Sequence, residues 1–265
     1  MNTVTSKDGT TIAYDKAGQG APLILVGGAF EQRAMDSETA QLAAFPLLAE
    51  NFTVIHYDRR GRGDSANTLP FAVAREIEDI EALIDATGGS AYVFGISSGA
   101  ALAFEAALSL GNKVKKLALY EPPYNDDADA RQAWRTFRTE LDAVLADGRN
   151  ADAVGLFMGL MGVPPEHLAG MREMPMWGMW EGVAPTIAYD AAALGEEAAI
   201  PIANSKKLTM SVLVMNGGES FPFMQTTAEA LADAIPDAEH RVVTGQAHEV
   251  SADALAPILV DFFSA

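Results

Sequence analysis

Residues 91–99 read AYVFGISSG, and this stretch decides the fold. Its first six residues form a continuous apolar run, which is typical of a strand buried on both faces of a parallel sheet. The run ends in Gly95-Ile96-Ser97-Ser98-Gly99, and an Ala- and Leu-rich segment with helical character, 97–110, follows it. A strand, a tight turn and a helix in this order are the context in which a G-x-S-x-G sequence presents a serine nucleophile.

The two glycines fit the same prediction. A turn this tight strains the backbone at the central residue, and small residues two positions before and after it keep the crossing backbone free of clashes. Ser97 would then lie at the N-terminus of a helix, whose dipole favours negative charge. The pentapeptide alone also fits an ordinary glycine-rich turn, so its position after a buried strand is what favours a reactive serine.

Similar apolar runs recur along the chain and predict a mostly parallel, doubly wound α/β sheet. The further predicted strands are 22–28, 53–58, 116–121, 211–216 and 241–244. The predicted helices between and after them are 74–87, 225–235 and 252–264. Asp8-Gly9 sits between two alternating segments within 2–16, which indicates a hairpin at the start of the chain.

The interval 124–207 interrupts this alternation and contains no convincing buried strand. Helical patterns at 129–147 and 151–161 predict an inserted helical cap within one domain, 1–265. The cap is rich in methionine and tryptophan, notably in MREMPMWGMW at 171–180. These side chains either form a substrate-binding lid of loose specificity or pack the core of the cap itself.

His248 is the candidate general base. A serine hydroxyl needs a base to remove its proton, and imidazole suits that role at neutral pH. His248 follows the last predicted strand on a late loop, just before the terminal helix. By contrast, His56 lies inside a predicted strand and is expected to be a core residue, whereas His167 and His240 are expected to face solvent.

Composition narrows the possible functions and partners. The 265 residues carry a formal net charge of −18, which disfavours binding to nucleic acid or to anionic membranes. The absence of cysteine excludes disulfides and thiolate chemistry, and no motif predicts a metal or an organic cofactor. No signal peptide or run of about 20 apolar residues is present, so a cytoplasmic protein is the expectation.

The chain resembles the small, capped α/β-hydrolases that include many esterases. The resemblance rests on the 95–99 pentapeptide, His248, the segment GGAF at 27–30, and YDRRGRGDS at 57–65. It implies an oxyanion hole made by two backbone N–H groups, those of Ser98 and Ala29. Within the segment 57–65, Arg60 and Asp64 are interpreted as structural residues.

The third member of the expected triad departs from the family pattern, because Ser220 stands where relatives usually carry aspartate. Two carboxylates could replace it. Glu219 is one residue earlier, and Glu121 ends the predicted strand before the cap, where some haloalkane dehalogenases of this fold take their acid. We favour Glu121 over Glu219, and an imidazole without a charged partner is the remaining alternative.

The resemblance and the residues together imply hydrolysis of a carboxylic ester, or of a lactone or thioester, through an acyl-enzyme. The expected substrate is a small, apolar molecule. Alternatives on the same site are a carbon–carbon bond hydrolase, a lyase or a cofactor-free perhydrolase. A slowly turning-over ligand receptor and an inactive scaffold are the alternatives from other functional classes.

Overall fold

The computed structural model describes residues 1–34 and 40–265. Its centre is an eight-stranded sheet in the order β1-β2-β4-β3-β5-β6-β7-β8. The strands are β1 (Asn2–Thr5), β2 (Thr11–Ala17), β3 (Pro22–Val26), β4 (Thr53–Tyr57), β5 (Ala91–Ile96), β6 (Val114–Tyr120), β7 (Ser211–Gly217) and β8 (Ala238–Val243). The pairs β1–β2 and β2–β4 are antiparallel, and every other pair is parallel. The predicted doubly wound α/β sheet is therefore confirmed.

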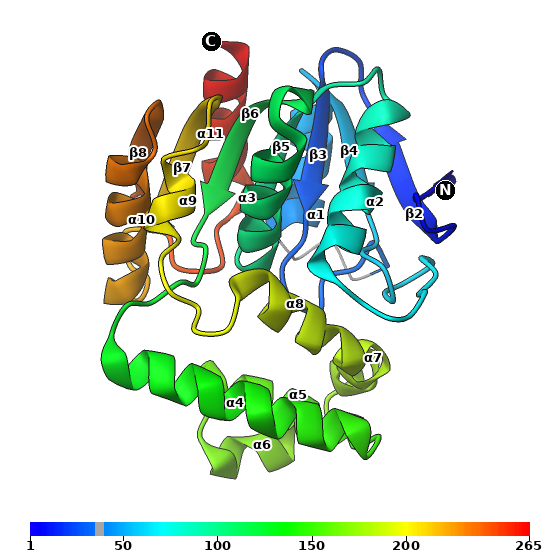
Figure 1. Ribbon diagram of the computed structural model, residues 1–265, viewed down its shortest axis with the longest axis vertical. Coiled ribbons are helices and arrows are strands. Elements are labelled where there is room, and N and C mark those ends of the chain that lie inside the picture. Colours follow the sequence, from blue (N-terminus) through cyan, green and yellow to red (C-terminus); the bar gives the residue numbers. More distant parts are fainter. Residues whose placement is uncertain (35–39) are drawn as a thin grey trace.

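Helices cover both faces of the sheet (Figure 1). One face packs against α2 (Val73–Asp85), α3 (Ser98–Leu110) and α10 (Pro222–Ala234), and the other packs against α1 (Ala40–Ala49) and α11 (Ala252–Ser264). Strands covered on both faces must be apolar on both sides, which is why β3 to β7 read as continuous runs of Val, Ile and Leu.

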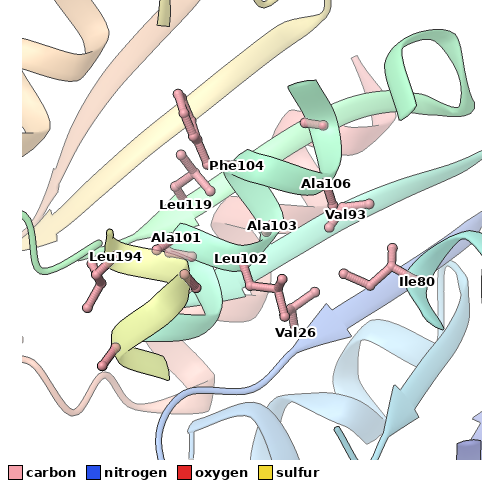
Figure 2. Close-up of a cluster of buried hydrophobic side chains, with 14 of the residues drawn as sticks. Val26, Ile80, Val93, Ala101, Leu102, Ala103, Phe104, Ala106, Leu119 and Leu194 are labelled. Atoms are coloured by element: carbon pink, nitrogen blue, oxygen red, sulfur yellow. The ribbon is translucent and has the colours of Figure 1, made fainter. Parts of the chain in front are cut away.

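Helix α3 forms the centre of the larger core, and Figure 2 shows its Ala and Leu side chains between the sheet and its neighbouring helices. Nine of its residues are buried, seven of them glycine, alanine or serine. Small side chains allow α3 to approach β5 on one side and α8 (Ile187–Leu194) on the other. The first turn of α3, where Ser98 lies, is consequently fixed from both directions.

The interval between β6 and β7 is helical, as the sequence predicted, and its first helices lie beyond the ends of the parallel strands in Figure 1. Its helices are α4 (Ala128–Ala146), α5 (Asn150–Leu160), α6 (Pro165–Met171), α7 (Pro175–Val183), α8 and α9 (Ile202–Ser205). We call the segment from α4 to α9 the helical insertion. The helical insertion also contacts the loop after β3, because the ring of Phe30 packs edge-on against the ring of Phe157 with 5.0 Å between the ring centroids.

Two sequence-based assignments need correction. Strand β8 begins at Ala238, so His240 lies within the strand instead of before it. Its side chain is half-buried, and its Nε2 is 2.7 Å from Asn216 Oδ1, so it does not simply face solvent. Strand β6 ends at Tyr120, so Glu121 lies immediately after the strand and has a left-handed φ of 47°.

Candidate active site

Ser97 lies at a sharp turn between β5 and α3. Its φ of 55° is unfavourable for a residue with a Cβ, and its backbone N–H donates to Tyr120 O at 2.9 Å. The flanking glycines allow the turn: a Cβ on Gly95 would lie 2.5 Å from Gly99 O, and a Cβ on Gly99 would lie 2.3 Å from Val26 O. The glycine requirement predicted from the sequence is therefore met by close backbone crossings.

The structure brings His248 to Ser97. His248 lies on the loop between β8 and α11, and its Nε2 is 3.1 Å from Ser97 Oγ. The preceding residue is held by the Tyr120 hydroxyl, which donates to Ala247 O at 2.5 Å. Gly217 fixes the same loop from the other side, since a Cβ there would lie 2.3 Å from Gln246 O. The position of the imidazole is thus set by β6, β7 and their loops together.

Glu121 is the carboxylate that contacts this imidazole. Its Oε2 is 2.6 Å from His248 Nδ1, and it is fully buried. Gly217 N–H donates to its Oε1 at 2.7 Å, and the Ser220 hydroxyl donates to its Oε2 at 2.9 Å. A buried carboxylate needs such donors, because an unpaired buried charge is strongly unfavourable. Glu121, His248 and Ser97 thus form one continuous hydrogen-bonded series.

The alternative carboxylate is elsewhere. Glu219 is exposed, and its backbone N–H donates to Gln246 O at 2.8 Å. Ser220 stands at the position where relatives usually carry aspartate. It has no carboxylate, and its hydroxyl donates a hydrogen bond to the carboxylate of Glu121. Of the residues that the sequence left open, Glu121 is the one that the structure brings to His248.

A cavity of about 360 Å³ opens above Ser97. Ala29 and Ser98 line it beside Ser97, as the oxyanion-hole prediction requires, and Gly28 is near enough that a Cβ on it would lie 3.2 Å from Ser97 Cβ. The rest of the lining is mostly apolar and comes from the helical insertion and from the start of α10. These apolar residues include Trp134, Phe137, Phe157, Leu160, Met161, Ile187, Leu194, Phe221, Phe223 and Met224.

The methionines and tryptophans of the insertion divide between two environments. Trp134 and Met161 line the cavity, and Trp177 is buried within the insertion. The methionines of the 171–180 cluster do not line the cavity; Met174, Met176 and Met179 are exposed. Some of these side chains thus line the cavity and others pack within the insertion, and the cluster 171–180 contributes none of the methionines that line the cavity.

A buried charge network lies behind the cavity, and the sequence reasoning missed its central member, Asp190. Asp190 is 3% exposed on α8 and lies between two fully buried arginines, Arg59 and Arg62, of the segment 57–65. Burial alone would raise the pKa of Asp190, but the two guanidinium groups lower it below the ordinary value. The only sequence signal for this residue is a carboxylate inside the apolar stretch IAYDAAAL.

The remaining predicted residues lie where the sequence placed them. Arg60 is buried and pairs with Asp79 and Asp8, and Asp64 is exposed and pairs with Arg33. Both contacts are remote from Ser97 in the hydrogen-bond network, as a structural role requires. His56 is buried and His167 is exposed.

Within 1–34 and 40–265, no group of three or more His, Cys, Asp or Glu side chains is arranged to hold a metal ion. Over the same residues, no helix has both the length and the apolar character needed to cross a membrane.

Comparison with known proteins assigns the chain to a family. Residues 23–257 match the model described as "Alpha/beta hydrolase family". The chain belongs to the alpha/beta hydrolase family. The segment 57–65, the turn at Ser97 and the position of His248 all fall within the matched region.

Individual relatives are similar over different shares of the chain. An alpha/beta hydrolase from Sphaerobacter thermophilus is 47% identical, with 99% of this chain and 100% of that chain covered and a TM-score of 0.86. A thermophilic esterase from Thermogutta terrifontis is 22% identical, with 99% and 97% covered and a TM-score of 0.73, which is a likeness of fold. A proline iminopeptidase from Pestalotiopsis fici is 28% identical over 118 residues, and the match spans 42% of this chain and 41% of that protein.

Proposed function

We propose that this protein is a serine hydrolase that cleaves a carboxylic ester, or a related lactone or thioester, through an acyl-enzyme. The observation that carries the proposal is the unbroken series from Glu121 through His248 to Ser97 beneath a mostly apolar cavity. A buried carboxylate that accepts from the imidazole Nδ1–H keeps Nε2 free to accept the proton of the serine hydroxyl.

The proposed reaction has two halves. Ser97 Oγ attacks the ester carbonyl carbon while His248 Nε2 takes the hydroxyl proton, and the tetrahedral oxyanion accepts hydrogen bonds from the Ala29 and Ser98 N–H groups. The intermediate collapses as His248 returns the proton to the departing alcohol. Water then attacks the acyl-enzyme by the same route, which releases the carboxylic acid and restores Ser97.

The lining of the cavity favours an uncharged substrate. Its two acidic side chains are already neutralised, since Asp190 pairs with Arg59 and Arg62, and Glu197 pairs with Arg131 and Arg135. A peptidase that recognises the free amino terminus of its substrate needs a carboxylate or another acceptor that is not already paired with a cation of the protein. An apolar ester therefore fits this cavity better than the peptide substrate that the name of the proline iminopeptidase indicates.

Labelling with a fluorophosphonate tests the nucleophile. We expect stoichiometric modification of Ser97, located by peptide mass spectrometry, and loss of both labelling and p-nitrophenyl ester turnover in Ser97→Ala. Ser109→Ala is the matched control, because Ser109 is an exposed serine near the other end of the same helix. Labelling that persists in Ser97→Ala would contradict the proposal.

Assays of the wild-type protein with ester and anilide substrates distinguish an esterase from a peptidase. We expect multiple turnovers of neutral p-nitrophenyl esters and no measurable release of p-nitroaniline from proline p-nitroanilide. A single stoichiometric burst of p-nitrophenol without further turnover would instead indicate a receptor that retains its product. Faster anilide than ester hydrolysis would exclude the ester assignment.

A further inference from the structure

The segment 57–65 places two buried arginines directly behind the loop that follows β3. Arg62 Nη1 donates to Gly28 O at 2.6 Å, and Arg59 Nη1 donates to Gly27 O at 3.3 Å. Both side chains are almost completely buried. Since the loop after β3 carries Ala29, these contacts anchor the backbone next to one of the two N–H groups assigned to the oxyanion hole.

The bond from Arg62 acts on Ala29 through a single peptide unit. The Gly28 carbonyl and the Ala29 N–H belong to the same planar trans amide, so fixing one end fixes the direction of the other. A cationic donor on the carbonyl also polarises the amide, which strengthens its N–H as a donor. Arg62 therefore controls both the aim and the strength of the Ala29 N–H.

Asp190 connects this arrangement to the second N–H group. Its Oδ2 accepts from Arg62 Nη2 at 2.6 Å, and its Oδ1 accepts from Arg59 Nη1 at 2.5 Å and from the Ser98 hydroxyl at 2.9 Å. Ser98 directly follows the nucleophile and supplies the other proposed oxyanion donor. The carboxylate of Asp190 thus contacts Ser98, which carries one oxyanion donor, and Arg62, which holds the peptide that carries the other donor.

The partners of Arg62 come from the helical insertion. Besides Asp190 on α8, Arg62 Nε donates at 2.9 Å to the hydroxyl of Thr186, in the 3-10 turn Ala184–Thr186 just before α8. The closeness of α8 to α3 is visible in Figure 2, where Leu194 lies beside Ala101. All three donor groups of the Arg62 fork are therefore assigned, and two of them end on the insertion.

We propose that Asp190 is a positioning residue for catalysis: it fixes both oxyanion-stabilising N–H groups, directly through Ser98 and through Arg62 for the Gly28–Ala29 peptide. The inference rests on the proposed function, since it assigns a purpose to the same oxyanion hole. It extends that function by making the helical insertion part of the catalytic framework, in addition to a wall of the substrate cavity.

The test compares two buried carboxylates of the same kind. Asp190→Asn weakens the link to Arg62 and Ser98, whereas Asp79→Asn alters a carboxylate that is equally buried and pairs with the adjacent Arg60. We expect Asp190→Asn to lower kcat for a neutral ester by about 10- to 100-fold, less than the loss of an entire oxyanion donor, with KM changed by less than about threefold. Affinity for an alkylboronic acid should fall by the same factor as kcat/KM. Asp79→Asn should change kcat by less than about twofold in folded protein, on the same scale.

A second pair of variants keeps the test decisive if Asp190→Asn does not fold. Arg62→Lys retains the positive charge but loses the fork that holds three partners, and Arg60→Lys is its neighbour in the same loop. We expect Arg62→Lys to lower kcat by about tenfold, and Arg60→Lys to leave it within about twofold. Equal losses of kcat in the two members of either pair would overturn the inference.

Backbone NMR separates this inference from the proposed function. We expect the Ala29 and Ser98 amide resonances to move in Asp190→Asn and to stay in place in Asp79→Asn. This measurement needs no substrate, so it still decides the positioning role in a protein that hydrolyses no ester. Unmoved Ala29 and Ser98 resonances in Asp190→Asn would refute it, whatever the activity of the wild type.

Discussion

Glu121 shows how much chemistry depends on the placement of one residue. It lies one position beyond the end of β6, with a left-handed backbone and three donors on its carboxylate. A carboxylate held in this way can orient the imidazole and stabilise the imidazolium formed during proton transfer. These are the two roles that the family usually gives to an aspartate at position 220.

The variant Glu121→Gln tests that role. We expect kcat for an ester to fall by about 10³–10⁴-fold with little change in KM, because the loss is a misoriented imidazole and an unstabilised imidazolium. Glu219→Gln is the matched control and should lose less than about tenfold, since Glu219 is exposed and its carboxylate is not the one that contacts His248. Full activity in Glu121→Gln would exclude Glu121 as the acid.

Position 220 offers a gain-of-function check on the same residue. In Glu121→Gln, the additional change Ser220→Asp should restore part of the lost kcat, because the two side chains already lie within hydrogen-bond distance of each other. In the wild-type background the same change should lower stability, since it places a second carboxylate beside a buried one.

At the scale of elements, the turn at Ser97 depends on α3 and β3 approaching within van der Waals contact. We expect Gly99→Ala to separate them, because its Cβ would lie 2.3 Å from Val26 O and 2.4 Å from Gly27 O, both backbone atoms. The variant should lose about 1–3 kcal/mol of unfolding free energy and most fluorophosphonate labelling. Urea denaturation and labelling together measure the two effects.

The matched control is the same chemical change in an open position. Gly178 lies within α7, and a Cβ there would meet no atom within 4 Å. Gly178→Ala should therefore leave labelling unchanged and raise stability by about 0.5–1 kcal/mol through helix propensity. A labelling loss in Gly178→Ala as large as that in Gly99→Ala would show that the effect is not specific to the crossing.

Helices and strands with a clear local sequence pattern could be predicted. Those that depend on contacts between residues far apart in the sequence could not. The buried strands β3 to β7 read as apolar runs because both of their faces are covered. The edge strand β8 starts earlier than predicted because its first residues need no apolar run: Ala238 and His240 are partly buried, and Glu239 is exposed. Helices α6 and α7 both begin with proline and were not predicted; α6 ends at the first residue of the methionine-rich cluster 171–180, and α7 begins within it.

The same division applies to the candidate site. Ser97 and His248 were singled out from local patterns at the ends of strands, and Ser98 and Ala29 from the resemblance to a known family. The sequence favoured Glu121 over Glu219 but left both open, because the contact between Glu121 and His248 depends on the relative placement of β6, β7 and the loop of His248. Asp190 was missed because its partners are more than 90 positions away along the chain, so only the folded chain shows what neutralises it.

At the scale of the whole molecule, stability depends on the imidazole of His56, which is not part of the series from Glu121 to Ser97. His56 is buried in β4, and burial lowers its pKa to about 4; the charges of Asp58 and Asp15 raise the pKa and that of Arg33 lowers it, each by less than burial does. Between pH 4 and the ordinary value of 6.5 the unfolded chain binds a proton that the folded protein does not. The unfolding free energy therefore rises with pH across this window and falls as the pH is lowered through it.

Replacement of that histidine tests the effect. We expect the wild type to lose about 3 kcal/mol more than His56→Leu when the pH is lowered from 6.5 to 4, at about 1.4 kcal/mol per unit. Urea denaturation at several pH values measures both proteins, and their difference isolates the imidazole from all other titrating groups. Parallel pH profiles for the two proteins would contradict this assignment.

The hydrogen bond between Ser220 and Glu121 also has an evolutionary consequence. The ends of β6 and β7 form two adjacent anchorage points from which an acid can reach one imidazole. A descendant that acquired aspartate at position 220 before losing Glu121 would pass through a sequence in which two carboxylates can contact His248. It would never pass through a sequence in which His248 has no carboxylate partner. The acid can therefore move from the end of β6 to the loop after β7 through a sequence that keeps its activity, although the second carboxylate lowers the stability of that intermediate.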